Sequence, residues 1–219
     1  MNRLPLALLL ISAGSGLLRP QNIQEPENLA DTVDRLVRYH DFGAYDYQIR
    51  QVANAARACL DARVKTRQGE EKLAAVFDID ETALSNWATM VDCGFCSYPA
   101  QLKLYPRPAH DPVIAPVLEL FNFAKGKQVA VFFVTGRQEQ QRAATESNLA
   151  EAGYSHWDGL YMQRDGNTEP ASVFKPRNRR DIEAKGYKIV LSIGDQASDL
   201  AGCCAERVFK LPNPFYLLK

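Results

Sequence analysis

The sequence has few histidines and no excess of basic residues, the features that mark zinc fingers and nucleic-acid-binding proteins. It contains only 3 histidines in 219 residues, none at the spacing of a zinc finger, and its 26 Lys and Arg equal its 26 Asp and Glu. Binding along a phosphate backbone needs a run of basic residues, and only residues 175–180 form a basic cluster here. The composition therefore argues against a nucleic acid as a structural partner.

An apolar stretch long enough to cross a membrane is also missing at the N-terminus. The apolar run at residues 4–11 is shorter than the roughly 20 residues that a spanning helix needs. Arg3 precedes it and small residues follow it, which is typical of a secretory signal peptide over residues 1–16, the alternative being an apolar terminus without a targeting role. No cysteine follows the run, so no stable membrane anchor is indicated. We expect a secreted or periplasmic protein with a flexible segment at residues 17–28.

Cysteines are few and odd in number. They are Cys59, Cys93, Cys96, Cys203 and Cys204, so at least one thiol is unpaired or bonded to another chain. Cys93 and Cys96 form a Cys-x-x-Cys motif in a segment without a preceding strand. This context favours structural or incidental cysteines over a redox pair or half of a zinc site.

What the sequence does contain is a pair of acids behind a short apolar segment. Residues 73–77 are predicted to form a buried strand, and Asp78 and Asp80 follow where it ends. Alternation along a strand would turn both carboxylates to the same side. Their closeness is costly unless a cation lies between them or one keeps its proton. A magnesium ion satisfies the first condition, and a nucleophile beside a general acid uses the second.

Two other interpretations of this pair are open. The acids precede a stretch predicted as helical and would favour its N-terminus as capping residues. A calcium loop is disfavoured, because Ala83 stands where a sharp-turn glycine is needed and Thr82 at a ligand position. The rest of the chain decides between capping and catalysis.

The remaining apolar segments predict alternating strands and helices. Further strands are expected at residues 128–134, 157–161, 172–174 and 188–193, and helices at 29–37, 45–64, 82–90, 112–125, 138–152 and 179–185. Strands and helices in alternation, with glycines at several joints, indicate a parallel sheet covered on both faces. Residues 87–110, rich in Cys, Gly, Phe, Tyr and Pro, are expected to form a small insertion beside the site.

Polar residues follow three of these strands. Asp78 and Asp80 end the first, and corresponding residues end the others: Thr135 and Gly136 on the second, and Asp195 and Asp199 after the strand at 188–193. Ligands of parallel sheets bind beyond the carboxyl ends of the strands, so we expect these groups to converge. Lys175, just before a predicted helix, completes a set that is difficult to attribute to chance.

This set resembles the four motifs of the haloacid dehalogenase-like (HAD) phosphohydrolases. The matching segments are residues 77–82, residues 134–137, Lys175 and residues 193–199. More narrowly, Asp-Ile-Asp-Glu-Thr-Ala-Leu-Ser-Asn, Gly-Asp-Gln-x-Ser-Asp and Phe-Lys-Leu-Pro-Asn-Pro-Phe are similar to the branch of bacterial secreted acid phosphatases (class B/C-like) and plant vegetative storage proteins. The departures are Ala197, where this branch often has a bulky aromatic residue, and Pro176 directly after the lysine.

The resemblance covers most of residues 29–219 and implies both a fold and an activity. The implied fold is α/β, a Rossmann-like three-layer α/β/α HAD core with a parallel sheet, a helical N-terminal extension and a small cap insertion at about 87–110. The implied activity is that of a Mg²⁺-dependent acid phosphatase acting on small phosphomonoesters, nucleotides included.

The resemblance also implies the role of each catalytic residue. Asp78 would attack phosphorus and become an aspartyl phosphate, and Asp80 would protonate the leaving oxygen and later activate water. Thr135 and the amide of Gly136 would donate hydrogen bonds to phosphoryl oxygens. Lys175 would neutralise the charge shared by the nucleophile and the phosphate.

The implied magnesium ligands are acids from two segments: Asp78, Asp80, Asp195 and Asp199. Asp80 would use its backbone carbonyl, while Asp199 would bind through water or orient Lys175. Two alternatives remain. One is a non-catalytic storage or binding protein of this fold, which the presence of Asp78 disfavours. The other is a phosphotransferase that passes the phosphoryl group to an alcohol.

Overall fold

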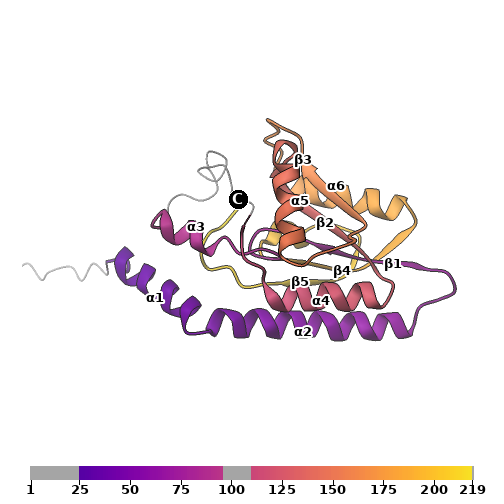
Figure 1. The fold of residues 1–219 in the computed structure, drawn as a ribbon, viewed down its shortest axis with the longest axis horizontal. Coiled ribbons are helices and arrows are strands. Elements are labelled where there is room, and N and C mark those ends of the chain that lie inside the picture. The colour runs from indigo at the N-terminus through magenta and orange to yellow at the C-terminus, as the bar shows by residue number, and fades with distance from the viewer. Residues whose placement is uncertain (1–24, 96–109, 219) are drawn as a thin grey trace, which may run out of the picture.

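The computed structural model describes residues 25–95 and 110–218 (Figure 1). The predicted signal peptide, most of the segment 17–28, Cys96 and the larger part of the predicted cap lie outside the described residues. The chain from Leu29 onward forms a sheet with helices on both faces. The expected three-layer α/β/α architecture is confirmed.

A parallel sheet forms the middle layer, with the strand order β3-β2-β1-β4-β5. The strands are β1 (Lys72–Phe77), β2 (Ala130–Gln138), β3 (Gly159–Gln163), β4 (Tyr187–Gly194) and β5 (Ala205–Lys210). Phe77 of β1 pairs with Phe133 of β2 and with Ile193 of β4. The residues that follow these three positions therefore leave the sheet at one edge. The strand order reverses direction at β1, which is the place where ligands of such sheets bind.

Successive side chains of the strands point to opposite faces of the sheet and pack into two separate apolar cores. Leu73, Ala75 and Phe77 face the larger core, which also holds buried residues of α2 (Ala44–Lys65), α4 (Ala115–Gly126) and α5 (Arg142–Glu151). Ala74 and Val76 face a second core, closed by α6 (Ala171–Ala184). Burial on both faces explains why β1 is apolar without interruption. Figure 1 shows α2 and α4 on one side of the sheet and α6 on the other.

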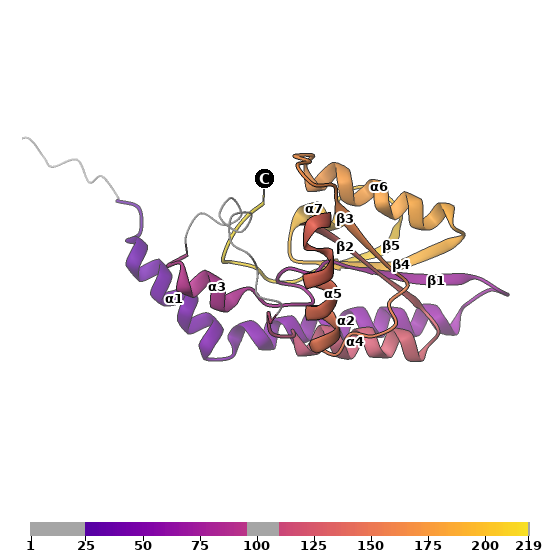
Figure 2. The same ribbon diagram turned by 45° about the horizontal axis from the view of Figure 1, so that its top comes forward.

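The N-terminal helices form the predicted extension. Helix α1 (Leu29–Asp41) begins at Asn28, whose side chain accepts a hydrogen bond from the Ala30 amide at 2.9 Å. Gly43, with a φ of 83°, separates α1 from α2. No residue of α1 is fully buried, and α1 extends beyond the end of the sheet (Figures 1 and 2). Helix α2, in contrast, packs five buried residues.

Two local predictions were wrong, and one strand was missed. Residues 172–174 are not a strand but the first turn of α6. The helix expected at 82–90 begins only at Trp87, as α3 (Trp87–Asp92), because residues 81–83 form a turn. Strand β5 was not predicted, and most of its residues are exposed at the edge of the sheet. The two short helical segments η1 (Glu139–Gln141) and α7 (Ala197–Leu200) complete the described elements.

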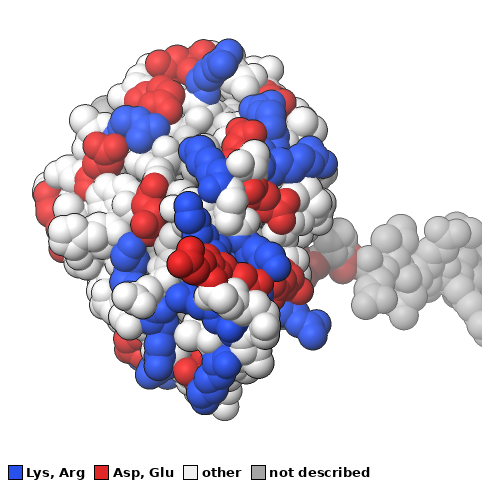
Figure 3. All heavy atoms as spheres, turned by 90° about the vertical axis from the view of Figure 1, so that its right-hand side faces the viewer, with Lys and Arg blue, Asp and Glu red and all other residues white. Residues whose placement is uncertain are grey.

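The surface at the end where α2 leads into β1 carries both signs of charge. Figure 3 shows Lys and Arg side chains interleaved with Asp and Glu on this face. Glu71 forms ion pairs with Arg63 at 3.1 Å and with Lys188 at 2.7 Å. The absence of a nucleic acid partner stays a prediction, and this mixed face agrees with it. Among the described residues, no helix combines the length and apolar character needed to cross a bilayer.

Two cysteines that are adjacent in sequence, Cys203 and Cys204, form a disulfide ahead of β5. The thiol of Cys59 on α2 is free and half-buried. The free thiol of Cys59 agrees with the expectation, from the odd count of five cysteines, that at least one is unpaired or bonded to another chain. Which cysteines pair was left open.

Candidate active site

Three buried carboxylates meet at the carboxyl edge of the sheet. Asp78 follows β1, Asp195 follows β4, and Asp199 lies in α7. One oxygen from each carboxylate lies within 4.8 Å of the others, and the three residues are 6%, 2% and 3% exposed. They meet because β1 and β4 are neighbours in the sheet and end level with one another. The predicted convergence of these acids is what the structure shows.

A buried lysine bridges two of these acids. Lys175 lies on α6, which packs on the sheet, and its Nζ donates to Asp78 Oδ1 and to Asp199 Oδ1, each at 2.5 Å. Pro176 does not prevent this, because α6 continues through it. Its ring lies 2.9 Å from the position of a Cβ built on Gly202, so a larger residue at 202 would press on the helix beside Lys175.

The cluster carries more negative charge than its lysine balances. In the described part of the chain, the three carboxylates receive one ammonium group, that of Lys175. Burial raises the pKa of Asp78 well above its usual value, opposed by Lys175. Burial, and then repulsion from Asp199, raises the pKa of Asp195 to about 7. Such a site favours bound protons or a bound cation.

The donor chemistry of this cluster suits a divalent metal ion. Its donors are carboxylate oxygens, which Mg²⁺ prefers, and their excess negative charge is what a divalent cation would neutralise. The described residues therefore contain an acid cluster able to bind a metal ion.

A glycine makes the close approach of Asp199 possible. A Cβ added to Gly194, the last residue of β4, would lie 2.4 Å from both Cβ and Oδ2 of Asp199. Asp199 also caps its own short helix, because its Oδ2 accepts a hydrogen bond from the Gln196 amide at 2.7 Å. Asp199 thus caps α7 and contacts Lys175 at the same time, and its functional role stays a prediction.

Asp80 faces a different partner from the other acids. Its carboxylate accepts hydrogen bonds from Arg137 at 2.8 Å and from the Asn86 side chain at 3.1 Å. It is not part of the three-acid group. Neither Asp78 nor Asp80 caps the helix that follows, since the N-cap of α3 is Asn86. The capping interpretation of the pair is therefore not supported.

Thr135 and Gly136 lie at the end of β2, in the same edge of the sheet. Thr135 is buried, and its Oγ1 accepts a hydrogen bond from the Arg137 amide at 3.2 Å. Gly136 is exposed, and a Cβ added there would meet no atom within 4 Å. The backbone at this position is therefore open to a ligand. The roles predicted for both residues stay predictions.

Comparison with known proteins decides the family. The sequence profile described as HAD superfamily, subfamily IIIB (acid phosphatase), matches residues 18–219. The chain belongs to this family.

The relatives agree with this assignment. Acid phosphatase 1 of Solanum lycopersicum is 33% identical over 153 residues, which cover 65% of this chain and 58% of that protein. Vegetative storage protein 2 of Arabidopsis thaliana is 30% identical over 145 residues, which cover 64% of this chain and 55% of that protein. The chain thus spans less than two thirds of the length of these relatives. The predicted resemblance to the acid phosphatase and vegetative storage protein branch is confirmed.

A solved structure shares the fold of this HAD chain. The class C acid phosphatase from Bacillus anthracis, solved with tungstate bound, superposes with a TM-score of 0.71 at 24% sequence identity. The match covers 86% of each chain. It therefore supports the architecture over nearly the whole described region.

Sequence reasoning missed the support that the N-terminal extension gives to the first HAD motif. Glu81 is fully buried with a φ of 51°, and it accepts hydrogen bonds from Tyr45 Oη at 2.7 Å and from the Asn86 amide. Burial raises the pKa of Glu81 to about 7. Tyr45 lies at the start of α2, so the extension holds the turn that carries Asp80. No local pattern in the sequence announces this contact.

The C-terminal segment also supports the HAD site. The side chain of Asn213 donates a hydrogen bond to Asp195 Oδ2 at 2.6 Å, and Gln196 donates to the same oxygen at 2.6 Å. The Leu218 amide in turn donates to Gln196 Oε1 at 3.1 Å. Asn213 belongs to the Phe-Lys-Leu-Pro-Asn-Pro-Phe segment, so a signal was present in the sequence although its role was not.

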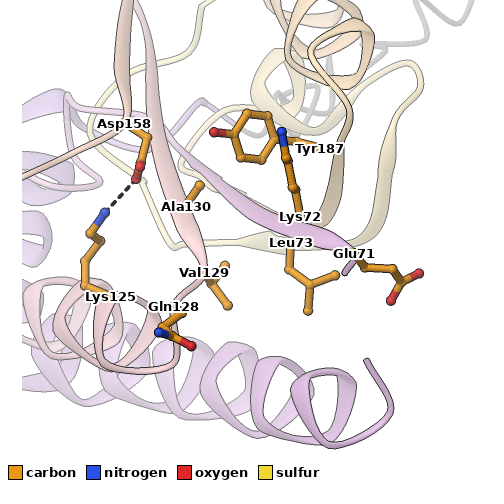
Figure 4. A pocket seen from close by; sticks show the side chains of 9 residues that line it. All are labelled: Glu71, Lys72, Leu73, Lys125, Gln128, Val129, Ala130, Asp158 and Tyr187. Carbon is orange, nitrogen blue, oxygen red and sulfur yellow. Dashed lines mark hydrogen bonds and ion pairs between the residues drawn. The ribbon is translucent and has the colours of Figure 1, made fainter. Parts of the chain in front are cut away.

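A hollow lies at the opposite edge of the sheet from the acids (Figure 4). It is lined by residues at or before the starts of strands and by the end of α4: Glu71, Lys72, Leu73, Lys125, Gln128, Val129, Ala130, Asp158 and Tyr187. Lys125 and Asp158 form an ion pair across it at 2.6 Å. Glu71, Lys125 and Asp158 of this lining form ion pairs, and none of the predicted site residues lies there.

Proposed function

We propose that this chain is a Mg²⁺-dependent acid phosphatase that hydrolyses phosphomonoesters through an aspartyl phosphate on Asp78. The observation that carries the proposal is the buried group of Asp78, Asp195, Asp199 and Lys175 at the carboxyl edge of the sheet. Membership of an acid phosphatase family supports it. A buried carboxylate nucleophile beside a cation is suited to attack a phosphate that would otherwise repel it.

The first step transfers the phosphoryl group to Asp78. A carboxylate oxygen of Asp78 forms a bond to phosphorus as the bond between phosphorus and the ester oxygen breaks. Asp80 gives its proton to the departing oxygen, so that the alcohol leaves neutral. Lys175, already in contact with Asp78, offsets the charge that the nucleophile and the phosphoryl oxygens share.

The second step returns the enzyme to its starting state. Asp80, now ionised, takes a proton from a water molecule that attacks phosphorus, and inorganic phosphate leaves Asp78. Thr135 and the amide of Gly136 would donate hydrogen bonds to phosphoryl oxygens in both steps. The exposed, unobstructed backbone at Gly136 agrees with that role.

The side chains that would hold Mg²⁺ are those of Asp78, Asp195 and Asp199. From the sequence motif, Asp80 would add its backbone carbonyl, while its side chain remains with Arg137. When bound, the ion would supply positive charge against the phosphoryl oxygens and the nucleophile.

The substrate we infer is a small phosphomonoester, nucleotides included. We also infer that the protein is secreted or periplasmic, with residues 1–16 as the signal peptide and residues 29–219 as the phosphatase domain. Sequencing the N-terminus of the protein after expression in a secreting host tests the signal peptide. A mature chain that still begins at Met1 would contradict it.

The test of the activity is Asp78→Asn in a panel of phosphomonoesters, with Mg²⁺ or with a chelator. We expect turnover by the unchanged protein that depends on the metal, and a loss of at least about 10⁴-fold in Asp78→Asn, since nucleophile loss has effects of that size. The matched control is Asp181→Asn, an exposed acid on the same helix as Lys175.

Three outcomes of this experiment contradict the proposal or part of it. Turnover retained in Asp78→Asn would reject the nucleophile. An unchanged protein that hydrolyses nothing in the panel would favour the storage or binding alternative. A phosphorylated alcohol as the main product, when an alcohol is added, would assign phosphotransfer instead of hydrolysis.

A further inference from the structure

We propose that Arg137 and Asp111 are positioning residues for Asp80, and that they hold its carboxylate apart from the metal-binding acids, ready to serve as the proton donor. This inference rests on the proposed function. It assigns a task to Arg137, a motif residue to which the resemblance gave no role, and to Asp111, which lies outside the four motifs.

Arg137 binds the Asp80 carboxylate through two nitrogens of its guanidinium group. Its Nη2 donates to Asp80 Oδ1 at 2.8 Å, and its Nε lies 3.3 Å from both oxygens of that carboxylate. The remaining Nη1 donates to Thr145 Oγ1 of α5 at 3.3 Å. A planar group held at several points fixes the plane of its partner as well as its distance.

Asp111 in turn contacts Arg137, at the same nitrogen that donates to Asp80. Its Oδ2 accepts a hydrogen bond from Arg137 Nη2 at 3.1 Å. Asp111 is itself fixed by Asn148 of α5, which accepts from the Asp111 amide and donates to the Asp111 carbonyl, each at 2.9 Å. Arg137, Asp111, Thr145 and Asn148 are all at most 8% exposed. The residues that hold the Asp80 carboxylate are therefore fixed by several hydrogen bonds and largely shielded from solvent.

The network separates two tasks among neighbouring carboxylates. Lys175 contacts Asp78 and Asp199, whereas Asp80 contacts Arg137 and Asn86. Asp80 lies two residues from the nucleophile, and Arg137 fixes the plane of its carboxylate on the side away from Lys175. Loss of Arg137 would remove the charged group that sets this orientation. A carboxylate turned out of this orientation would no longer deliver a proton to the leaving oxygen.

A purely structural role is the competing explanation for these residues. Buried ion pairs often contribute little net stability, and apolar residues of equal volume replace them well in some proteins. Stability measurements alone therefore do not separate the two roles. A kinetic readout that responds only to proton donation does.

Leaving groups of different basicity provide that readout. Dinitrophenolate leaves without protonation, whereas the alkoxide of β-glycerophosphate needs a proton as its bond to phosphorus breaks. The value of kcat/KM reports the steps up to release of the alcohol, so it isolates the first half of the reaction. We would measure kcat/KM for 2,4-dinitrophenyl phosphate and for β-glycerophosphate in the same Mg²⁺ buffer.

For Arg137→Met we expect kcat/KM for β-glycerophosphate to fall by about 100-fold, the lower end of what general acid catalysis contributes. The value for 2,4-dinitrophenyl phosphate should change by less than about 3-fold, since that reaction bypasses the proton donor. Asp80→Asn should show the same split, with a larger loss.

Two milder variants keep the test informative where Arg137→Met does not fold. Arg137→Lys keeps the charge but loses the fork, and Asp111→Asn keeps the shape but loses the charge that orients Arg137. Both should show the same split with a smaller loss, on the order of 10-fold for β-glycerophosphate, because each removes part of the support. The matched control is Arg50→Met, a half-exposed arginine on α2 paired with Glu119, which should show no split.

The outcomes separate this inference from the proposed function. Equal losses on both esters in the Arg137 and Asp111 variants, or no loss on either, would overturn the positioning role. If Asp80→Asn itself shows no split, or if the unchanged protein hydrolyses neither ester, the proposed function fails and this inference fails with it. A split in Asp80→Asn without one in folded Arg137 variants rejects only the positioning role.

Discussion

The two edges of the parallel sheet differ in how their charged side chains are arranged. At the amino edge, where α2 leads into β1, acids and bases are paired at the surface (Figure 3). Glu71 there contacts Arg63 and Lys188, and Lys125 contacts Asp158. At the carboxyl edge, Asp78, Asp195 and Asp199 are buried together with Lys175.

The pKa values of the acids follow this difference. The Gln68 amide, and then Lys188, lower the pKa of Glu71 to about 2. Burial raises the pKa of Asp195 to about 7 and that of Asp78 well above its usual value. Paired surface charges add little to stability, whereas crowded buried acids cost stability and are found where a protein binds or reacts. The carboxyl edge therefore carries the chemistry and the amino edge belongs to the scaffold. Four experiments test this distinction.

The largest expected effect is that of Lys175→Met. Asp78 and Asp199 would lose their shared cation, so we expect phosphatase activity to fall by about 10³-fold, as for loss of a main electrostatic group. Breaking a buried ion pair costs on the order of 3–5 kcal/mol, which urea unfolding with a chelator would measure. The matched control is Lys188→Met at the amino edge, because Lys188 also pairs with an acid but is itself exposed. Equal losses in both variants would remove the distinction between the edges.

The next effect is a dependence of stability on pH. Because the pKa of Asp195 rises from an unfolded value of 3.8 to about 7, the folded state binds the proton more tightly. The metal-free protein should therefore lose stability, by a few kcal/mol, as the pH rises from about 4 to about 7. Asp195→Asn should weaken this loss, and Mg²⁺ at 100 times its Kd should add about 2.7 kcal/mol to the unchanged protein at pH 7. Thermal melts between pH 4 and pH 8 test both, and a flat profile in the chelated protein would contradict the raised pKa.

A smaller effect is expected from steric crowding at the carboxyl edge. Gly194→Ala places a Cβ 2.4 Å from Asp199, so that acid must move away from Lys175. We expect at least about a 10-fold loss of activity and a loss of roughly 1–3 kcal/mol, typical of overpacking. Gly126→Ala is the control, because its Cβ would meet nothing within 4 Å. Activity assays and urea unfolding of both variants decide, and full activity in Gly194→Ala would show that Asp199 need not sit where it does.

The smallest effect is expected at the amino edge. Glu71→Gln removes two ion pairs, a mostly buried one with Arg63 and one with the exposed Lys188. Activity should stay unchanged, and the unfolding midpoint near pH 7 should fall only slightly, because the amide oxygen of Gln still accepts hydrogen bonds there. Since the pKa of Glu71 is lowered, its contribution is present above pH 4.5 and disappears as the pH falls toward 2. A thermal melt at pH 7 and an activity assay suffice. A large loss of activity would mean that the amino edge takes part in function.

The sequence predicted which residues lie at the carboxyl edge of the sheet, because a buried strand is recognisable as a short apolar run. Uninterrupted apolar runs located β1, β2 and β4, and the acids directly behind β1 and β4 then had to lie at one edge of a parallel sheet. The position of Lys175 came from the family resemblance, since residues 175–180 alone look like a solvated basic face. In the structure Lys175 is 5% exposed.

The failures have physical reasons as well. Val173 and Phe174 favour a strand locally, but Pro170 begins a helix whose buried face includes Phe174, Asn178 and Ile182, four residues apart. Strand β5 is an exposed edge strand and has little apolar pattern to detect.

The long-range polar contacts that support the motif residues could not be predicted from the sequence. Arg137 meets Asp80 across a separation of 57 residues, and Glu81 meets Tyr45 across 36. Side-chain pairs of this kind depend on how elements dock after the strands and helices have formed. No spacing rule relates them.

The contact between Asn213 and Asp195 has a consequence for the timing of assembly. A chain emerging from the ribosome as far as β5 already contains every acid of the cluster, yet Asp195 still lacks one of its two side-chain hydrogen-bond donors. Trimming by a carboxypeptidase past Asn213 would recreate that unfinished condition in a mature molecule.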